Sequence, residues 1–343
     1  MKVALVEFSE NHSECLFSQA LFLQDASITY VIICNRKLQQ ELEALEGLDA
    51  HYFDYPAHSG GKFRAFWKIR GFILKGKFDR VILNTAQSGP AKWFCLIPFP
   101  RKVRFFGILH NLEKLRNSFG QKIISLKLSG YFVLNDRLLK SLRSGKGNFQ
   151  SFYPIFFPSV KSVYPEKKND EIWICIPGEV SFKRRDYAAL FASLDFDKPI
   201  KNVKFILLGR ILGHTKPIID EYSQHPNFPQ MIKLYRGFVP FQEFHSIVNA
   251  SDLIMPLIHP KEDQTYMNSK TSGSINLALA YQKPLLAHSY WKNCEDFQGI
   301  FYDPSNLQET LAALQIPVMK ITNSPRLKFE NQKNRYIKFI KHQ

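Results

Sequence analysis

Long apolar runs are missing from this chain of 343 residues. A helix that spans a bilayer needs about 20 consecutive apolar residues, whereas apolar stretches here, such as residues 103–109, have only the length of a strand. The N-terminus meets Glu7 after a short apolar run and carries no small-residue cleavage site, which indicates a first strand and not a signal peptide. We therefore expect a cytoplasmic protein without a transmembrane segment.

Cysteine pairs and glycine fingerprints are also missing. The five cysteines are odd in number and widely spaced, which indicates reduced thiols and not a disulfide framework. No Cys-x-x-Cys pair or His-x-x-x-His spacing is present, so we predict no metal site. A Gly-x-Gly-x-x-Gly fingerprint is absent as well, which argues against a nicotinamide oxidoreductase.

Acidic residues are too few to balance the basic ones. The chain has 46 lysines and arginines against 30 aspartates and glutamates, a formal net charge of +16. Such an excess favours an acidic partner, which the charge leaves open as a phospholipid surface, a nucleic acid or a phosphorylated substrate.

Short apolar segments alternate with helix-length spacers in both halves of the chain, a pattern typical of parallel sheets covered on both faces. The predicted strands cover residues 2–8, 28–34, 50–55, 80–84, 103–110, 131–135, 171–176, 203–208, 232–237, 253–258, 284–287 and 300–302. We predict an α/β protein with two Rossmann-like domains, residues 1–158 and 171–322, joined by a polar linker at 159–170. The length suits two hydrophobic cores.

Two segments combine basic and aromatic residues. Residues 323–343 predict a C-terminal amphipathic helix, which either packs on the first domain or lies on a membrane, and we favour packing. The apolar positions of residues 62–77 fit a core-facing helix and an interfacial helix equally well.

The segment 268–287 predicts a small-residue loop, a helix and a buried strand. The loop and helix start contain Lys270, Thr271, Ser272, Gly273 and Ser274. Unpaired first-turn amides and the positive end of the helix dipole attract phosphate, and the lysine adds a cation. A helix merely capped by serine or threonine explains the same residues about as well.

Other polar groups follow predicted strands of the second half, where ligands of parallel sheets bind. Gly178 ends one strand and precedes the cluster of Arg184 and Arg185, which suits a diphosphate, although a solvated basic turn is the alternative. The residues that follow the strands predicted at 203–208 and 232–237 are expected to line a pocket for the base and ribose of a nucleotide. Its residues are Gly209, Arg210, Phe238 and Val239.

In the first half, the strand 103–110 ends at His110, whose imidazole could bind a sugar hydroxyl or act as a base. A structural role for this histidine is about as plausible. The loop 7–14 contains His12, and it either contacts an acceptor or caps a helix through Ser9 or Asn11; we favour capping.

Taken in order, these motifs resemble the GT-B glycosyltransferases, and glycosyltransferase family 4 in particular. The segments that carry the resemblance lie mainly in the second half, at residues 177–187, 207–210, 237–239, 249–257 and 270–287. The resemblance implies two Rossmann-like domains facing across a cleft, with a nucleotide-sugar bound mainly by the second and an acceptor mainly by the first. It also implies that basic groups replace a metal and that no cofactor is tightly bound.

One departure from family 4 concerns a pair of glutamates around the donor loop. The matching positions here hold Ser269 and Leu277, and neither is acidic. Sugar recognition must therefore differ or the donor site is degenerate. The candidate substitutes are Glu262, Asp263, Tyr266 and Asn276.

We therefore predict an enzyme that transfers a sugar from a nucleoside diphosphate sugar to a polysaccharide, glycolipid or lipid-linked acceptor of the cell envelope. Its catalytic residues would be His110, Arg185 and Lys270. An anionic membrane surface is a further expected partner, which would place the protein on the inner face of the membrane, and a nucleic acid is not expected. The alternative is a non-catalytic, transferase-like protein that binds anionic lipid, polysaccharide or nucleic acid through its basic surface.

Overall fold

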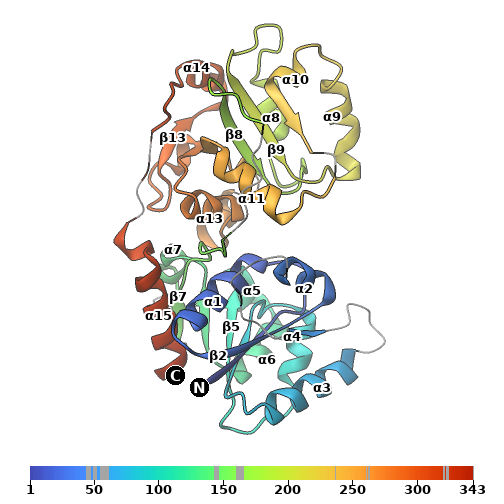
Figure 1. Ribbon diagram of the computed structural model, residues 1–343, viewed down its shortest axis with the longest axis vertical. Helices are drawn as coiled ribbons and strands as arrows, with labels where there is room; N and C mark the ends of the chain where they lie inside the picture. Colours follow the sequence, from blue (N-terminus) through green and yellow to red (C-terminus); the bar gives the residue numbers. More distant parts are fainter. Residues whose placement is uncertain are drawn as a thin grey trace. The chain divides into compact units, whose positions relative to one another are not determined.

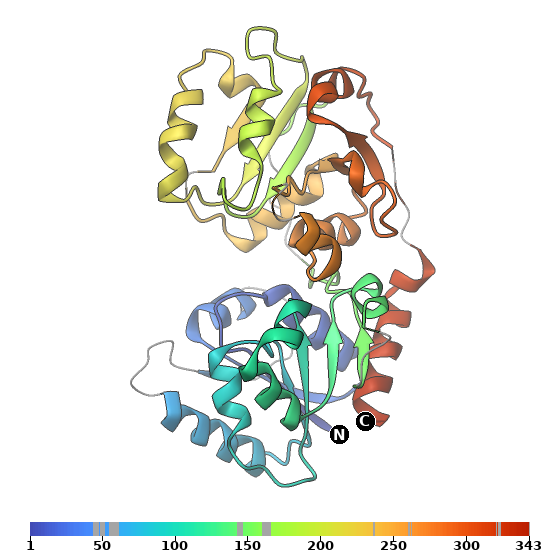
Figure 2. The same cartoon turned by 180° about the vertical axis from the view of Figure 1, so that it is seen from behind.

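The computed structural model describes residues 1–43, 48, 52–54, 62–142, 147–159, 166–235, 237–259, 261, 263–319, 321 and 324–342. The chain divides into two compact units, each built on one parallel sheet (Figures 1 and 2). The first unit holds Met1–Ser159, Met267–Thr271 and Ser324–Gln343, and the second holds Val160–Tyr266 and Ser272–Asn323.

The first unit contains a seven-stranded sheet in the order β3-β2-β1-β4-β5-β6-β7. All of its pairings are parallel. Its strands are β1 (Lys2–Val6), β2 (Thr29–Cys34), β3 (Tyr52–Asp54), β4 (Arg80–Leu83), β5 (Arg104–Leu109), β6 (Leu128–Val133) and β7 (Phe149–Ser151). The strand order reverses between β1 and β4, so their carboxyl ends flank the switch point at which ligands of such sheets bind.

Helices cover both faces of this sheet, which explains why its central strands are apolar and buried along most of their length. The helices are α1 (Ser13–Asp25), α2 (Arg36–Glu43), α3 (Lys62–Lys75), α4 (Gly89–Cys95), α5 (Leu112–Asn117), α6 (Phe119–Lys127), α7 (Asp136–Lys140) and α15 (Phe329–His342). Residues of α3, α4 and α6 share one hydrophobic cluster with β1, β4 and β5.

The C-terminal helix α15 lies beside α1 and β7 (Figure 1). Its Tyr336 is fully buried and stacks on Phe132 with ring centroids 4.7 Å apart. Arg335 Nη1 donates to Asp136 Oδ1 at 2.5 Å and to Ser151 Oγ at 2.9 Å. The apolar face of α15 is therefore taken up by the first unit and is not available to a membrane.

The second unit contains a six-stranded sheet in the order β10-β9-β8-β11-β12-β13, also parallel throughout. Its strands are β8 (Ile172–Pro177), β9 (Val203–Leu208), β10 (Ile232–Leu234), β11 (Leu253–Ile254), β12 (Leu285–His288) and β13 (Gly299–Tyr302). The remaining helices are α8 (Tyr187–Ala192), α9 (Lys216–Tyr222), α10 (Phe228–Met231), α11 (Phe241–Ala250), α12 (Asp263–Asn268), α13 (Gly273–Ala280) and α14 (Leu307–Ala312). Here the order reverses between β8 and β11.

The two parallel α/β sheets confirm the predicted fold class, and each predicted strand has a counterpart. The strand predicted at 50–55 lies partly outside the described residues, as does the predicted linker at 159–170. The sequence did not reveal β7, whose three residues, Phe-Gln-Ser, are too few to show a pattern. Within the described residues, no helix is long and apolar enough to cross a membrane.

Candidate functional site

Two glycines form a close backbone contact where β8 and β9 end in the second unit. Gly178 has a φ of 101°, a conformation that side chains with a Cβ rarely adopt. A Cβ on Gly209 would lie 2.2 Å from the carbonyl oxygen of Gly178. Gly209 therefore has no room for a side chain, and the backbone conformation of Gly178 favours glycine.

Arg185 forms hydrogen bonds to the ends of two strands of the same unit. Its Nη1 donates to the carbonyl oxygen of Pro256 at 2.5 Å, just after β11, and its Nη2 donates to the carbonyl oxygen of Pro177, the last residue of β8. The guanidinium therefore supports the carboxyl edge of the sheet. Each terminal nitrogen keeps a second N–H, so an anion can still bind there.

The other predicted residues near Arg185 have distinct surroundings. Arg184 is exposed. The head of α8 is capped by Asp186, which accepts a hydrogen bond from the amide of Ala189 at 3.1 Å. The helix start beside this basic cluster thus already carries a carboxylate, which offsets the attraction of the helix dipole for a second anion.

Two residues of the predicted base and ribose pocket lie exposed on the second unit. Arg210 is paired with Glu179 at 2.9 Å. Phe238 is 71% exposed after β10, while Val239 beside it is buried. An exposed aromatic ring at a strand end is suited to stacking on a nucleotide base.

The start of α13 has both features that the sequence left as alternatives. Ser272 is the N-cap, and its Oγ accepts from the amide of Ser274 at 3.3 Å. Ser274 itself is only 2% exposed, yet its Oγ has no hydrogen-bond partner among the described residues, and neither does the buried Oγ1 of Thr271. Buried hydroxyls are normally satisfied, so these two lack the partner that such groups usually have. Gly273, the first residue of α13, lies between them in the sequence and is exposed.

The structure divides the predicted diphosphate ligands between the units. Lys270 and Thr271 belong to the first unit, whereas Arg184, Arg185 and the start of α13 belong to the second. The carbonyl oxygen of Lys270 accepts a hydrogen bond from Arg137 Nη2 at 3.1 Å. Arg137 is a cation that was not predicted as a site residue, although it lies just after the strand predicted at 131–135.

At the carboxyl edge of the first sheet, a buried carboxylate follows β1. Glu7 is fully buried. It accepts hydrogen bonds from Asn84 Nδ2 at 2.8 Å, Thr85 Oγ1 at 2.6 Å and the Ser9 amide at 2.7 Å. Burial raises the pKa of Glu7, and the hydrogen bonds offset only part of the rise. Glu7 thus fixes the ends of β1 and β4 at the switch point.

His110, the predicted strand-end histidine, stacks on His12 with ring centroids 3.9 Å apart. Its Nε2 lies 2.8 Å from the carbonyl oxygen of Asn84. Burial lowers the pKa of His110 to about 3, so the ring is neutral at physiological pH. Since a carbonyl only accepts, Nε2 carries the proton, and Nδ1 is left as an acceptor.

His12 forms a pair with Glu14, whose Oε1 lies 3.2 Å from His12 Nδ1. Burial by itself lowers the pKa of His12, but the hydrogen bond and the charge of Glu14 outweigh it and raise the pKa overall. The same pair lowers the pKa of Glu14 despite its burial. Sequence reasoning missed this pair because it favoured capping by Ser9 or Asn11. That prediction was wrong, because α1 starts after His12, at φ 70°, without any side-chain cap.

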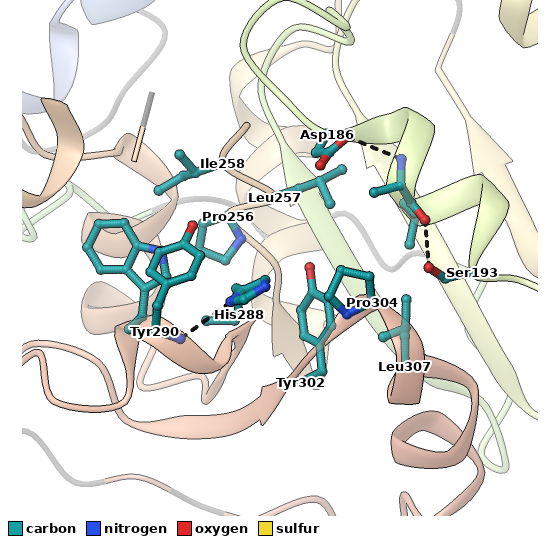
Figure 3. A pocket seen from close by; sticks show the side chains of 14 residues that line it. Asp186, Ser193, Pro256, Leu257, Ile258, His288, Tyr290, Tyr302, Pro304 and Leu307 are labelled. Carbon is teal, nitrogen blue, oxygen red and sulfur yellow. Dashed lines mark hydrogen bonds between the residues drawn. The ribbon is translucent and has the colours of Figure 1, made fainter. Parts of the chain in front are cut away.

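A small pocket opens beside α8 in the second unit (Figure 3). It is lined by side chains from the ends of β11, β12 and β13, among them Leu257, His288 and Tyr302. It encloses about 60 Å³, enough for a few water molecules but far less than the roughly 300–1,000 Å³ of a typical ligand pocket. This pocket alone therefore does not hold a nucleotide-sugar.

The remaining candidates add little to the site. Glu262 lies outside the described residues. Asn276 is buried within α13. Among the residues that the structure describes, no three His, Cys, Asp or Glu side chains are grouped so as to hold a metal ion.

Comparison with known proteins shows similarity in fold and not in sequence. No protein-family model and no curated protein matches the chain. Among solved structures, the UDP-GlcNAc 2-epimerase of Methanocaldococcus jannaschii is 14% identical, with a TM-score of 0.63 and full coverage of both chains. Anabaena HepE, in complex with UDP and glucose, is 15% identical, with a TM-score of 0.61 over 91% of this chain and 89% of that one.

A glycosyltransferase from Rickettsia africae is 12% identical, with a TM-score of 0.55 over 99% of this chain and 94% of that one. At such identities the likeness concerns the fold, and membership of family 4 stays a prediction. The two parallel sheets and these neighbours together show that the chain has the GT-B fold of glycosyltransferases and UDP-GlcNAc 2-epimerases.

Proposed function

We propose that this protein is a glycosyltransferase that moves a sugar from a nucleoside diphosphate sugar to a polysaccharide, glycolipid or lipid-linked acceptor in the cytoplasm. The observation that carries the proposal is the start of α13. There a helix N-terminus, an exposed glycine and the buried, unpartnered hydroxyl of Ser274 lie at the carboxyl edge of a parallel sheet. A diphosphate would satisfy the hydroxyl and the helix dipole together.

The leaving nucleoside diphosphate gains negative charge as the glycosidic bond breaks. The amides of Gly273 and Ser274 and the cations Arg184 and Arg185, all in the second unit, would stabilise that charge. A contribution of Lys270, which belongs to the first unit, is a separate part of the proposal. Because these groups neutralise the diphosphate, we propose that the reaction needs no metal and no tightly bound cofactor. Lys270→Ala should then lower turnover about 100-fold or more, and unchanged turnover would remove Lys270 from the mechanism.

The acceptor side of the reaction needs a proton acceptor. We assign it to His12, whose Nδ1 faces Glu14 and whose Nε2 is left for the acceptor hydroxyl. The hydroxyl oxygen bonds to the anomeric carbon, its proton moves to His12, and the bond to the diphosphate breaks with its electron pair on the leaving group. His110 Nδ1 would accept a hydrogen bond from a hydroxyl group of the sugar.

A thermal-shift panel with UDP, GDP, ADP and CMP tests the donor site, since a ligand that binds the native state raises its unfolding temperature. A nucleoside diphosphate that stabilises the wild type but not Ser274→Ala supports the proposal. Stabilisation by none of these nucleotides would favour the non-catalytic binder. If NAD, added to the same panel as a control, is the one compound that stabilises the protein, an oxidoreductase is favoured instead.

An activity assay then separates transfer from epimerisation, which the fold also accommodates in its solved neighbours. The protein is incubated with the nucleotide-sugar whose nucleotide stabilises it, with and without candidate saccharide acceptors. Acceptor-dependent release of the nucleoside diphosphate indicates transfer. Conversion of the sugar into its epimer, with the nucleotide still attached, would contradict the transferase assignment.

A further inference from the structure

Three helices of the first unit expose large apolar side chains to solvent. They belong to α3, to α4 with its C-cap, and to α6, and their exposure ranges from 43% for Trp67 to 90% for Leu126. The set is Phe63, Trp67, Trp93, Leu96, Phe119 and Leu126. A single exposed apolar residue is ordinary, but a group of six on neighbouring helices indicates an interaction surface.

These helices form one layer over the sheet. Phe66 of α3 and Phe94 of α4 contact each other in the core with ring centroids 5.8 Å apart. A Cβ on Gly120 of α6 would lie 3.2 Å from the side chain of Lys92 on α4. Figures 1 and 2 show the three helices next to one another in the first unit. Because their inner sides share one core, their outer sides make a common surface, here called the α3–α4–α6 face.

The charge of the chain is concentrated in the segment that contains these three helices. Residues 62–127 contain 15 lysines and arginines but only two acidic residues, a net charge of +13 in a chain whose total is +16. The helices α3, α4 and α6 themselves contain no acidic residue. Cations lie directly over exposed rings, with Arg70 5.4 Å from the centroid of Trp67 and Lys92 4.5 Å from that of Trp93.

We propose that the α3–α4–α6 face docks on the surface of an anionic phospholipid bilayer. Aromatic and leucine side chains would enter the boundary between head groups and acyl chains, while the long basic side chains remain at the level of the phosphates. This inference goes beyond the proposed function, since docking requires no transfer reaction. It also explains why the positive charge is so unevenly distributed along the chain.

Two other occupants fit the face less well. A second copy of the chain would bring two strongly positive surfaces together, which opposes association. Single-stranded nucleic acid binds through aromatic rings that stack on bases, but Leu96 and Leu126 have no ring, although both are more than half exposed. Apolar side chains of mixed shape suit a fluid hydrocarbon boundary.

Tryptophan fluorescence offers a direct measure of docking. Trp67 and Trp93 belong to this face and are exposed, whereas the other two tryptophans of the chain, Trp173 and Trp291, are buried in the second unit. Full-length protein is mixed with phosphatidylglycerol vesicles or with phosphatidylcholine vesicles. We expect co-sedimentation and a blue shift of the emission with the anionic vesicles only, both weakened by salt.

The variant that tests insertion is Phe119→Ser/Leu126→Ser, in which two outward side chains become polar. We expect about a 10-fold loss of vesicle binding, with an unchanged unfolding temperature showing that the fold is intact. The matched control, Ile218→Ser, alters an apolar side chain of the second unit that is 37% exposed, and it should bind like the wild type.

Three results would overturn the proposal. They are failure of the wild type to bind phosphatidylglycerol vesicles, wild-type binding by the double variant, and binding of a single-stranded oligonucleotide in place of vesicles. If the double variant does not fold, Phe63→Ser provides the same test on α3. None of these results depends on nucleotide binding, so the proposed function is tested separately.

Discussion

Replacing Arg185 by alanine tests whether this arginine supports the donor edge of the sheet or binds the ligand directly. The substitution removes two hydrogen bonds from a guanidinium to the carbonyl oxygens of Pro177, at the end of β8, and Pro256, just after β11. Hydrogen bonds to a charged group contribute about 1.5–3 kcal/mol each. Because the side chain is partly exposed, we reduce the sum for solvent screening and expect a loss of about 2–4 kcal/mol for the pair.

For a domain of roughly 150–250 residues, each kcal/mol corresponds to about 2–4 °C in the unfolding midpoint. Arg185→Ala should therefore lower the midpoint of the second unit by roughly 4–16 °C in a thermal melt. Arg185→Lys should recover little of this, since one ammonium group does not reproduce the two-armed geometry. Arg184→Ala is the matched control, because it removes the same charge from an exposed neighbour and should change stability by about 0.5 kcal/mol at most.

The two variants should also differ in ligand binding, measured by titration with the nucleotide that stabilises the wild type. Arg184→Ala should lower the affinity for that nucleotide about 10-fold, as expected for the loss of one charge-assisted contact. If Arg185→Ala melts like the wild type, the strand ends do not depend on the guanidinium and the reasoning from its contacts fails. If Arg185→Ala leaves the unfolding midpoint unchanged but abolishes nucleotide binding, Arg185 binds the diphosphate directly, as the sequence predicted.

Three further predictions concern pH, packing and the unpartnered hydroxyl. His12 acts as a base only when neutral and its pKa is raised above 6.5, so kcat/KM should fall as the pH drops through that raised value. Glu14→Gln should move this acid limb to lower pH, and a pH–rate profile with an unmoved limb would contradict the pairing. Gly209→Ala should lower the melting temperature by an amount equivalent to about 1–3 kcal/mol, because its Cβ would overlap backbone atoms; Gly213→Ala, which meets open space, should not. Ser274→Ala should keep or raise the melting temperature of the free protein, since it removes an unsatisfied buried hydroxyl, while it weakens nucleotide binding; a lower melting temperature would show that the hydroxyl is satisfied.

The order and type of the secondary structure could be predicted from the sequence because buried parallel strands are short, continuous apolar runs. Strand ends could be predicted for the same reason, and with them the positions of Gly178, Gly209 and His110. The α13 loop was visible as a cluster of small residues before an apolar helix. These are local properties, determined by residues close together along the chain.

Contacts between distant residues could not be predicted in this way. His12 and His110 stack although 98 positions separate them, and Arg185 reaches a carbonyl 71 residues away. Whether α3 is core-facing or interfacial was undecided from its periodicity; the structure buries Phe66 and exposes Phe63 and Trp67, so the helix has both properties.

The sequence by itself thus determined the two α/β halves, their strand ends and the excess of positive charge, because hydrophobic pattern and composition are carried by neighbouring residues. Only the tertiary structure decided which side chains meet at those strand ends, which hydroxyls are buried without a partner, and which side of each helix faces solvent. The physical reason is that burial and hydrogen bonding depend on what the fold brings into contact, and sequence spacing does not encode those partners.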